Sequence, residues 1–80
     1  MAGNAARLLE RLQARDTRVL AHIRAYPGLC SYEMARALEL DKWQIDQSLI
    51  QLFFDEQITF EYVTWRGPGR RKRVWRVKDQ

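Results

Sequence analysis

The spacing of apolar residues changes once along the chain, from helical to strand-like, and this limits the folds that the chain can adopt. Up to Phe53 the apolar residues recur three or four positions apart, as on one face of an α-helix. Ile58, Phe60 and Tyr62 then occupy every second position, as along a half-buried β-strand. A Gly-Pro-Gly turn at 67–69 returns the chain into a second strand-forming stretch. The chain is therefore expected to place its helices first and to end in one β-hairpin.

Capping residues and a turn signal divide the helical part of the chain. Asn4 and Asp16 are N-cap candidates for a first and a second helix, although no residue around Asp16 forbids one continuous helix. Pro27-Gly28 ends this stretch, and Ser31 and Asp41 are the N-cap candidates of the next two helices. The fold class expected from this order is α+β, with up to four helices before the hairpin.

Positive charge is concentrated at the C-terminal end of the 80-residue chain. The net charge of the whole chain is +4. Residues 66–80 alone carry five Arg and two Lys against one Asp, a net charge of +6, whereas residues 41–65 carry one Lys against five acids, a net charge of −4. A cluster of this kind is the electrostatic footprint of a polyanion, and nucleic acid is the commonest such partner.

The composition favours a folded protein from a reducing compartment. Hydrophobic residues make up 46% and aromatic residues 11% of the chain, which a disordered basic chain would lack. The single cysteine, Cys30, permits no internal disulfide and no multi-cysteine metal site. No apolar run approaches the roughly 20 residues that span a bilayer, and the first residues do not resemble a signal peptide. We expect a cytoplasmic protein without a membrane partner.

No catalytic or metal-binding pattern stands out. His22 has no Cys, Asp or second His at metal-ligand spacing, and Cys30 is expected to be a small buried residue, with a redox-sensing thiol as the alternative. The chain carries no Ser/His/Asp set, no Gly-rich phosphate loop and no carboxylate pair. We therefore expect no enzyme activity, no metal, no cofactor and no small-molecule ligand.

The stretch YPGLCSYEMARALELDKWQIDQSLIQLFFDEQI, followed by the basic hairpin, is similar to the helices of winged helix-turn-helix domains. It has the small Ala35 where two helices must approach and the apolar Leu40 in the turn between them. Residues 16–78 thus resemble the DNA-binding domains of MarR-like bacterial and archaeal regulators. At the corner where such domains often have Gly, this chain has Asp-Glu-Gln at 55–57. The resemblance implies an α+β winged helix domain over 16–80, with a three-helix core, a C-terminal β-hairpin wing and an extra N-terminal helix over 1–15.

The resemblance also implies a way of binding double-stranded DNA, as a small transcriptional regulator does. The third helix, 42–54, would enter the major groove, and the wing would lie on the backbone or in the minor groove. Helical spacing places an amide-rich face opposite the apolar stripe, and Gln and Ser can bond to base edges. The candidate contacts on the helix are Lys42, Trp43, Gln44, Gln47, Ser48 and Gln51. The candidate contacts on the wing are Arg66, Arg70, Arg71, Lys72, Arg73 and Arg76.

Several alternatives remain open at this point. Gln and Ser also fill ordinary solvated helix faces, and a charged hairpin can serve only to block edge-to-edge pairing of strands. Ile50 and Phe54 widen the apolar stripe of the third helix, which would suit a protein-interaction module that docks on an acidic partner. Structured RNA is a further candidate ligand.

The N-terminal helix suggests a homodimer. Leu8, Leu9 and Leu12 form an apolar stripe on a helix that is additional to a minimal winged helix domain. Such a stripe can pair with a second copy of the chain, or it can pack on its own domain. We expect a homodimer.

Overall fold

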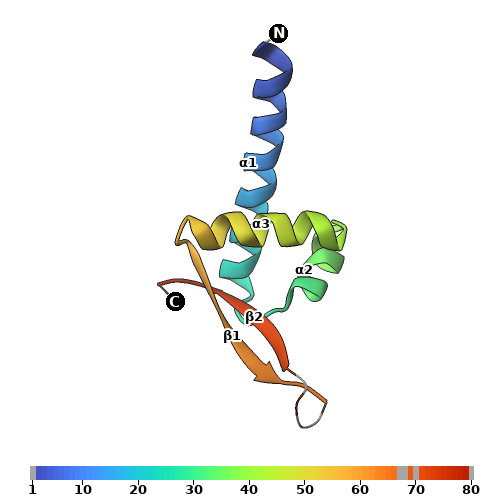
Figure 1. The fold of residues 1–80 in the computed structure, drawn as a ribbon, viewed down its shortest axis with the longest axis vertical. Coiled ribbons are helices and arrows are strands. Elements are labelled where there is room, and N and C mark those ends of the chain that lie inside the picture. The colour runs from blue at the N-terminus through green and yellow to red at the C-terminus, as the bar shows by residue number, and fades with distance from the viewer. Residues whose placement is uncertain (1, 67–68, 70, 80) are drawn as a thin grey trace.

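The structure, a computed structural model, describes residues 2–66, 69 and 71–79. Three helices come first: α1 (Ala2–Ala25), α2 (Ser31–Leu38) and α3 (Lys42–Phe54). Two antiparallel strands follow, β1 (Ile58–Thr64) and β2 (Arg71–Val77). The predicted α+β class, with helices first and a C-terminal hairpin, is therefore confirmed (Figure 1).

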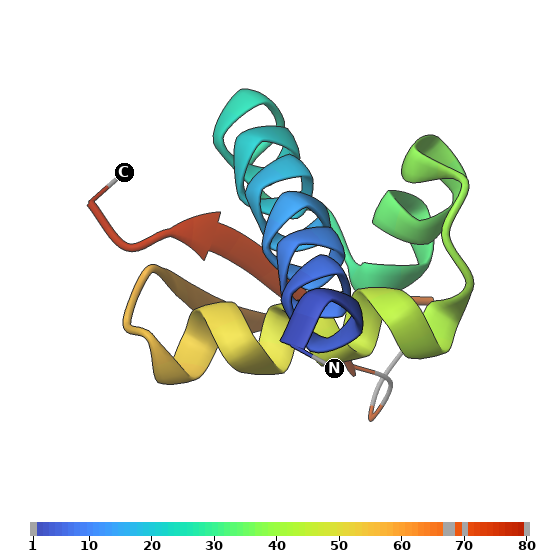
Figure 2. The ribbon, with the colours of Figure 1, turned by 90° about the horizontal axis from the view of Figure 1, so that it is seen from above.

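The first 24 described residues form one helix, α1, instead of two. The prediction that Asp16 caps a fresh helix is wrong, because its carboxylate accepts a hydrogen bond from Ser48 Oγ of α3 at 2.6 Å. The side chain is thus turned across to α3 and not back to its own backbone. A helix of this length is about 36 Å long, and its N-terminal half stands clear of the other elements (Figure 1). Figure 2, seen from above, shows α1 crossing over α3.

The next two helices begin at well-formed N-caps. Cys30 caps α2, one residue before the predicted Ser31, and its backbone N–H donates to a carboxylate oxygen of Glu33 at 3.2 Å. Asp41 caps α3 as predicted, accepting from the Gln44 backbone N–H at 2.8 Å. The Gln44 side-chain oxygen accepts from the Asp41 N–H at 3.1 Å in return. This reciprocal pair satisfies two backbone donors that the helix itself cannot satisfy.

The core lies where the three helices meet the hairpin. Its centre consists of fully buried aliphatic side chains from α1, α3 and β1, with Met34 from α2. Trp75 and Val77 close the core from β2. The buried core residues are Val19, Ile23, Met34, Ala35, Ile45, Leu49, Leu52, Ile58, Trp75 and Val77.

The hairpin is tied to the connection between α1 and α2. The Gly28 N–H donates to the Trp75 carbonyl at 2.9 Å, and the Trp75 N–H donates to the Leu29 carbonyl at 3.0 Å. Gly28 has φ of 94°, a left-handed conformation that glycine adopts without a steric penalty. Leu29, which follows the predicted helix stop at Pro27-Gly28, forms an isolated antiparallel bridge with Trp75. β2 therefore lies between β1 and Leu29.

Candidate nucleic-acid interface

A groove of about 470 Å³ separates the start of α3 from one face of the hairpin. We call it the hairpin groove. Pairing in the antiparallel sheet sets Tyr62 opposite Arg73 and Thr64 opposite Arg71, and paired residues lie on the same face of a sheet. Both arginines therefore face the groove. Its lining residues are Ser31, Lys42, Asp46, Ile50, Tyr62, Arg71, Arg73 and Trp75.

Arg73 is held against aromatic rings. Its guanidinium carbon lies 4.6 Å from the centroid of the Phe60 ring and 5.6 Å from that of Tyr62. One of its nitrogens also donates to the Tyr62 hydroxyl at 3.3 Å. Stacking on ring faces leaves the edge of a guanidinium available to an anion. The rings thus fix a positive charge at the mouth of the hairpin groove.

The other described cations of β2 lie on the opposite face and are paired with acids. Lys72 lies 3.4 Å from a carboxylate oxygen of Glu33, and Arg76 lies 3.0 Å from one of Glu61. Strand alternation separates them from Arg71 and Arg73. In the part of the chain that the structure describes, no ion pair includes Arg66, Arg71 or Arg73.

The structure therefore divides the predicted wing contacts into groups. Arg71 and Arg73 share the hairpin groove, whereas Lys72 and Arg76 are in ion pairs on the other face. Arg66 stacks on its neighbour Trp65, with 4.6 Å from the guanidinium carbon to the ring centroid. Arg70, also predicted as a contact, lies outside the described residues.

The ion pair on the far face includes a carboxyl with a shifted pKa. Hydrogen bonds from the thiol and the backbone N–H of Cys30 hold the pKa of Glu33 below its usual value, and the bond and charge of Lys72 lower it further. The negative form of Glu33 therefore both supports the cap of α2 and pairs with the hairpin.

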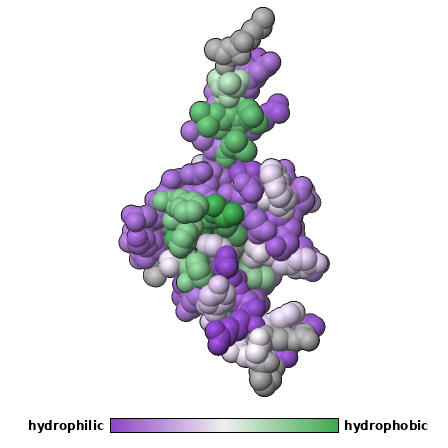
Figure 3. All heavy atoms as spheres, viewed as in Figure 1, coloured by the Kyte–Doolittle hydropathy of each residue, from purple (hydrophilic) through white to green (hydrophobic). Residues whose placement is uncertain are grey.

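The outward face of α3 is more apolar than the sequence analysis expected. Trp43, Ile50 and Phe54 are 68%, 48% and 76% exposed, and with Gln47 they form one stripe at helical spacing. Figure 3 shows apolar surface gathered over the C-terminal half of α3. Of the predicted helix contacts, Trp43 and Gln47 lie on this stripe. Lys42 lies at the edge of the hairpin groove, where it pairs with Asp46 at 2.9 Å.

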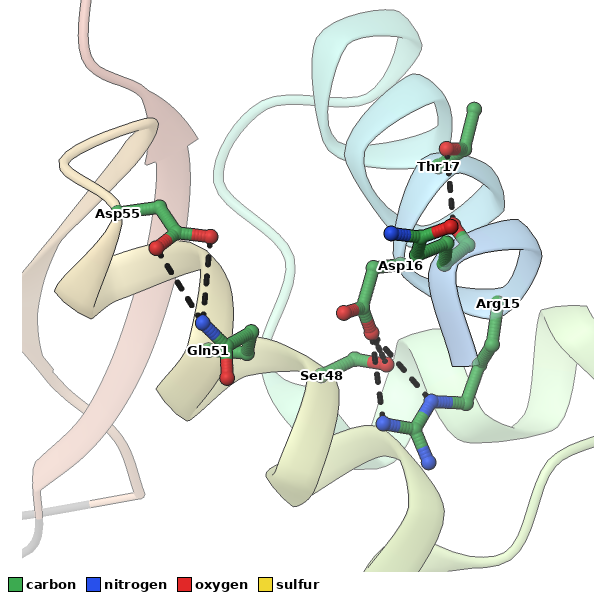
Figure 4. A network of polar contacts seen from close by, with 7 residues as sticks. Arg15, Asp16, Thr17, Ser48, Gln51 and Asp55 are labelled. Atoms are coloured by element: carbon green, nitrogen blue, oxygen red, sulfur yellow. Dashed lines mark hydrogen bonds and ion pairs between the residues drawn. The ribbon is translucent and has the colours of Figure 1, made fainter. Parts of the chain in front are cut away.

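Ser48 does not face solvent, and that prediction is wrong. The side chain is fully buried, and its hydroxyl donates to Asp16 of α1 (Figure 4). Gln51 lies nearby, and its side-chain amide donates to both carboxylate oxygens of Asp55 at 3.2 and 3.3 Å. Gln44 belongs to the N-cap pair. The amide-rich face is thus only partly free to contact a ligand.

Tyr62 is a groove residue to which the sequence analysis gave no functional role. The only signal for it was its place in the strand alternation, which put it on the face that packs on the core. That face extends past the core edge, so Tyr62 is 55% exposed beside Arg73.

Comparison with known proteins gives no assignment, since no protein-family model and no curated protein matches this chain. Among residues 2–66, 69 and 71–79, no helix has the length and apolar character needed to cross a bilayer. Over the same residues, no group of three His, Cys, Asp or Glu side chains is placed to hold a metal ion. Function is therefore inferred from the charges and rings of the hairpin groove and of α3.

Proposed function

We propose that the chain is a winged helix-turn-helix protein that binds double-stranded DNA and holds its backbone in the hairpin groove. The element order and the bridge between Leu29 and Trp75, which braces the hairpin, are compatible with that fold. The observation that carries the proposal is that Arg71 and Arg73 share one face of the hairpin, opposite Lys42. Neither arginine is in an ion pair with a described acid.

The groove offers a phosphate group three cationic side chains. The rings that hold Arg73 reduce the side-chain entropy lost on binding, because the guanidinium is already in place. Lys42 can exchange Asp46 for a phosphate at little cost, since an exposed i,i+4 pair of this kind is worth only about 0.3–0.5 kcal/mol. Backbone binding of this type is independent of sequence and sensitive to salt.

Sequence recognition would fall to the exposed stripe of α3 next to the groove. Gln47, on this stripe, can bond to an adenine edge. Trp43 and Ile50 can pack on sugars or thymine methyl groups. A small transcriptional regulator acting in the cytoplasm needs both parts: a grip on the backbone and a reading helix.

The test is fluorescence anisotropy of the protein with a mixed-sequence DNA duplex from about 50 to 200 mM salt. Arg71→Gln and Arg76→Gln remove the same charge from opposite faces of β2. We expect Arg71→Gln to weaken binding and to reduce the log–log salt slope by about 0.9, with a much smaller effect of Arg76→Gln. Equal losses in the two variants would place the DNA elsewhere, and a lack of binding at the lowest salt would overturn the proposal. Competition with duplex RNA in the same assay shows whether the protein prefers DNA or RNA.

A second candidate function is docking on an acidic protein partner. The observation that favours it is the exposed apolar patch at the end of α3, where Phe54 is 76% and Phe53 41% exposed beside the basic hairpin. Contiguous apolar patches on small proteins often mark protein interfaces. A stoichiometric partner recovered after nuclease treatment by the unaltered protein, and lost with Phe54→Glu, would favour this function over DNA binding.

A further inference from the structure

Aromatic rings form a continuous strip from the hairpin groove to the C-terminal end of α3. The ring centroids of Tyr62 and Phe60 lie 5.5 Å apart, as do those of Phe60 and Phe53, and those of Phe53 and Phe54 lie 6.3 Å apart. We call these four residues the ring strip. Neighbouring rings are inclined to each other by 46° to 82°. They therefore meet tilted or edge to face, and their faces are not used up by stacking on one another.

The ring strip is open to solvent along most of its length. Tyr62, Phe53 and Phe54 are 55%, 41% and 76% exposed. Phe60 packs against the core, and its ring is covered by Arg73, whose guanidinium carbon lies 4.6 Å from the ring centroid. A guanidinium is planar and can itself stack on a flat ring. The strip thus offers a ligand three exposed rings and a guanidinium plane.

The leucines of α1 form a different kind of exposed apolar surface. Leu8, Leu9 and Leu12, which are predicted to pair in a homodimer, are 59%, 56% and 38% exposed. They lie at the opposite end of the molecule from the tip of the hairpin (Figure 1). Aliphatic side chains suit another apolar surface, whereas ring faces also accept flat polar groups such as nucleobases. The ring strip, unlike the leucines, therefore fits a ligand made of flat rings.

Charge indicates where the phosphates of such a ligand would lie. Three cations and one acid line the hairpin groove, a net charge of +2. Tyr62 lines the same groove, so the ring strip begins at a cationic wall. At the far end of the strip, Phe54 is followed by Asp55, which accepts from the side-chain amide of Gln51. A strand of nucleic acid that enters from the groove would therefore bind through its phosphates near Tyr62 and through its bases farther along.

We propose that the ring strip stacks the bases of an unpaired DNA strand whose phosphates lie at Arg71 and Arg73 in the hairpin groove. The protein then prefers DNA in which an unpaired stretch adjoins a duplex over an uninterrupted duplex. The proposal rests on the proposed function for one point, the hairpin groove as a phosphate site. Every base has flat faces, so this stacking is largely independent of sequence. It differs from the reading of base edges by α3, because a base can lie on a ring only when it is out of its pair.

The test compares the binding of two DNA molecules by fluorescence anisotropy. Both have the same duplex and a single-stranded overhang of about ten nucleotides, made of thymidines in one and of abasic nucleotides in the other. The two overhangs carry the same phosphates, so a difference in affinity comes from the bases. We expect the thymidine overhang to bind at least about tenfold more tightly, since each stacked base contributes about a factor of five or more. Equal affinities would overturn the proposal.

Ring-to-leucine substitutions test whether the ring strip is the site. Phe53→Leu and Phe54→Leu keep an apolar side chain but remove a flat face, so each should reduce the preference for the thymidine overhang by about fivefold. Tyr32→Leu, at a ring of α2 that is 62% exposed and outside the strip, is the matched control and should keep the preference. Circular dichroism checks that each variant is folded. A full preference in both phenylalanine variants would place the bases elsewhere and overturn the assignment.

The blunt duplex, as a third DNA molecule, separates this proposal from the proposed function. If the blunt duplex binds and the two overhangs are equal, duplex binding stands and base stacking is overturned. If the thymidine overhang binds and the blunt duplex does not, base stacking stands and duplex binding is overturned. An acidic protein that docks on the apolar surface should still bind Phe54→Leu, which distinguishes protein docking from stacking.

Discussion

Ser48 of α3 donates a hydrogen bond to Asp16 of α1 across 32 positions of the chain, with 2.6 Å between Oγ and Oδ1. Both groups lie where the two helices cross, and the serine is fully buried. Arg15 approaches the same carboxylate oxygen at 3.4 Å. A hydrogen bond to a charged acceptor is shorter and stronger than one between neutral groups. This contact therefore fixes the crossing of α1 over α3.

We expect Ser48→Ala to destabilise the domain by about 1–3 kcal/mol, because Asp16 loses a buried donor while keeping its charge. Urea unfolding measures the change. Gln47→Ala, one position away and exposed, should change stability by no more than about 0.5 kcal/mol. Equal effects of the two substitutions would show that the Ser48 bond adds no stability.

Glu56→Gly should stabilise the domain. Glu56 has φ of 59° at the corner after α3, a left-handed conformation that costs a side-chain-bearing residue roughly 1–2 kcal/mol. Part of that gain is lost because glycine is more flexible in the unfolded state, so we expect a net gain of about 0.5–1 kcal/mol. The neighbouring Gln57→Gly, at a residue whose φ is not positive, should destabilise instead. Thermal unfolding of the two variants separates these outcomes.

Stability should fall in acid partly through Glu33. Its pKa is lowered in the folded state from the ordinary value of 4.5, so its contribution is complete above that value and is lost as pH falls through the lower, folded value. Glu33→Gln should flatten the dependence of the unfolding midpoint on pH in this window. Lys72→Gln should keep most of the dependence, because the bonds from Cys30 are the larger cause. An unchanged profile for Glu33→Gln would contradict this assignment.

Arg71→Ala and Arg73→Ala should differ in stability while both weaken DNA binding. Arg73 stacks on Phe60 and Tyr62, and an exposed contact of this type is worth about 0.5–1 kcal/mol. Arg71 is exposed and has no such ring contact among the described residues. Chemical unfolding should therefore detect only the Arg73 change, and anisotropy with duplex DNA should detect both. A stability loss with Arg71→Ala would mean that its role in the hairpin is structural.

The sequence predicts the positions of the helices and strands better than it predicts which side chains of α3 are buried and which are exposed. Helical spacing, the Asp41 cap and the alternation from Ile58 all depend on near neighbours, and all three predictions are confirmed. Ser48 is different, because it lies three or four positions both from Gln44 and Gln51 and from Ile45 and Leu52. Spacing alone could not choose between the two faces. The choice was made by Asp16, a distant residue that the sequence analysis had assigned to a cap.

The charges of the hairpin show the same limit. Alternation along β2 predicts that its cations divide between two faces. Which face is neutralised depends on Glu33, 39 positions before Lys72, and on Glu61 across the hairpin. Neither pairing can be read from the local pattern of residues. Which cations of β2 line the hairpin groove without an acidic partner could therefore be learned only from the three-dimensional structure.

Because α1 is one continuous helix through Asp16, the side-chain directions in its two halves are fixed relative to each other about the helix axis. Each residue of an α-helix turns the chain by about 100°, so the direction of Leu9 and Leu12 is coupled to that of Asp16. One alanine inserted after Gln13 would swing the leucines to another side of the molecule while Asp16 kept its place against Ser48. Four inserted alanines would return them to within about 40° of their first direction, one turn farther from α3. The number of residues between Asp16 and the leucines therefore sets the direction in which the leucines face.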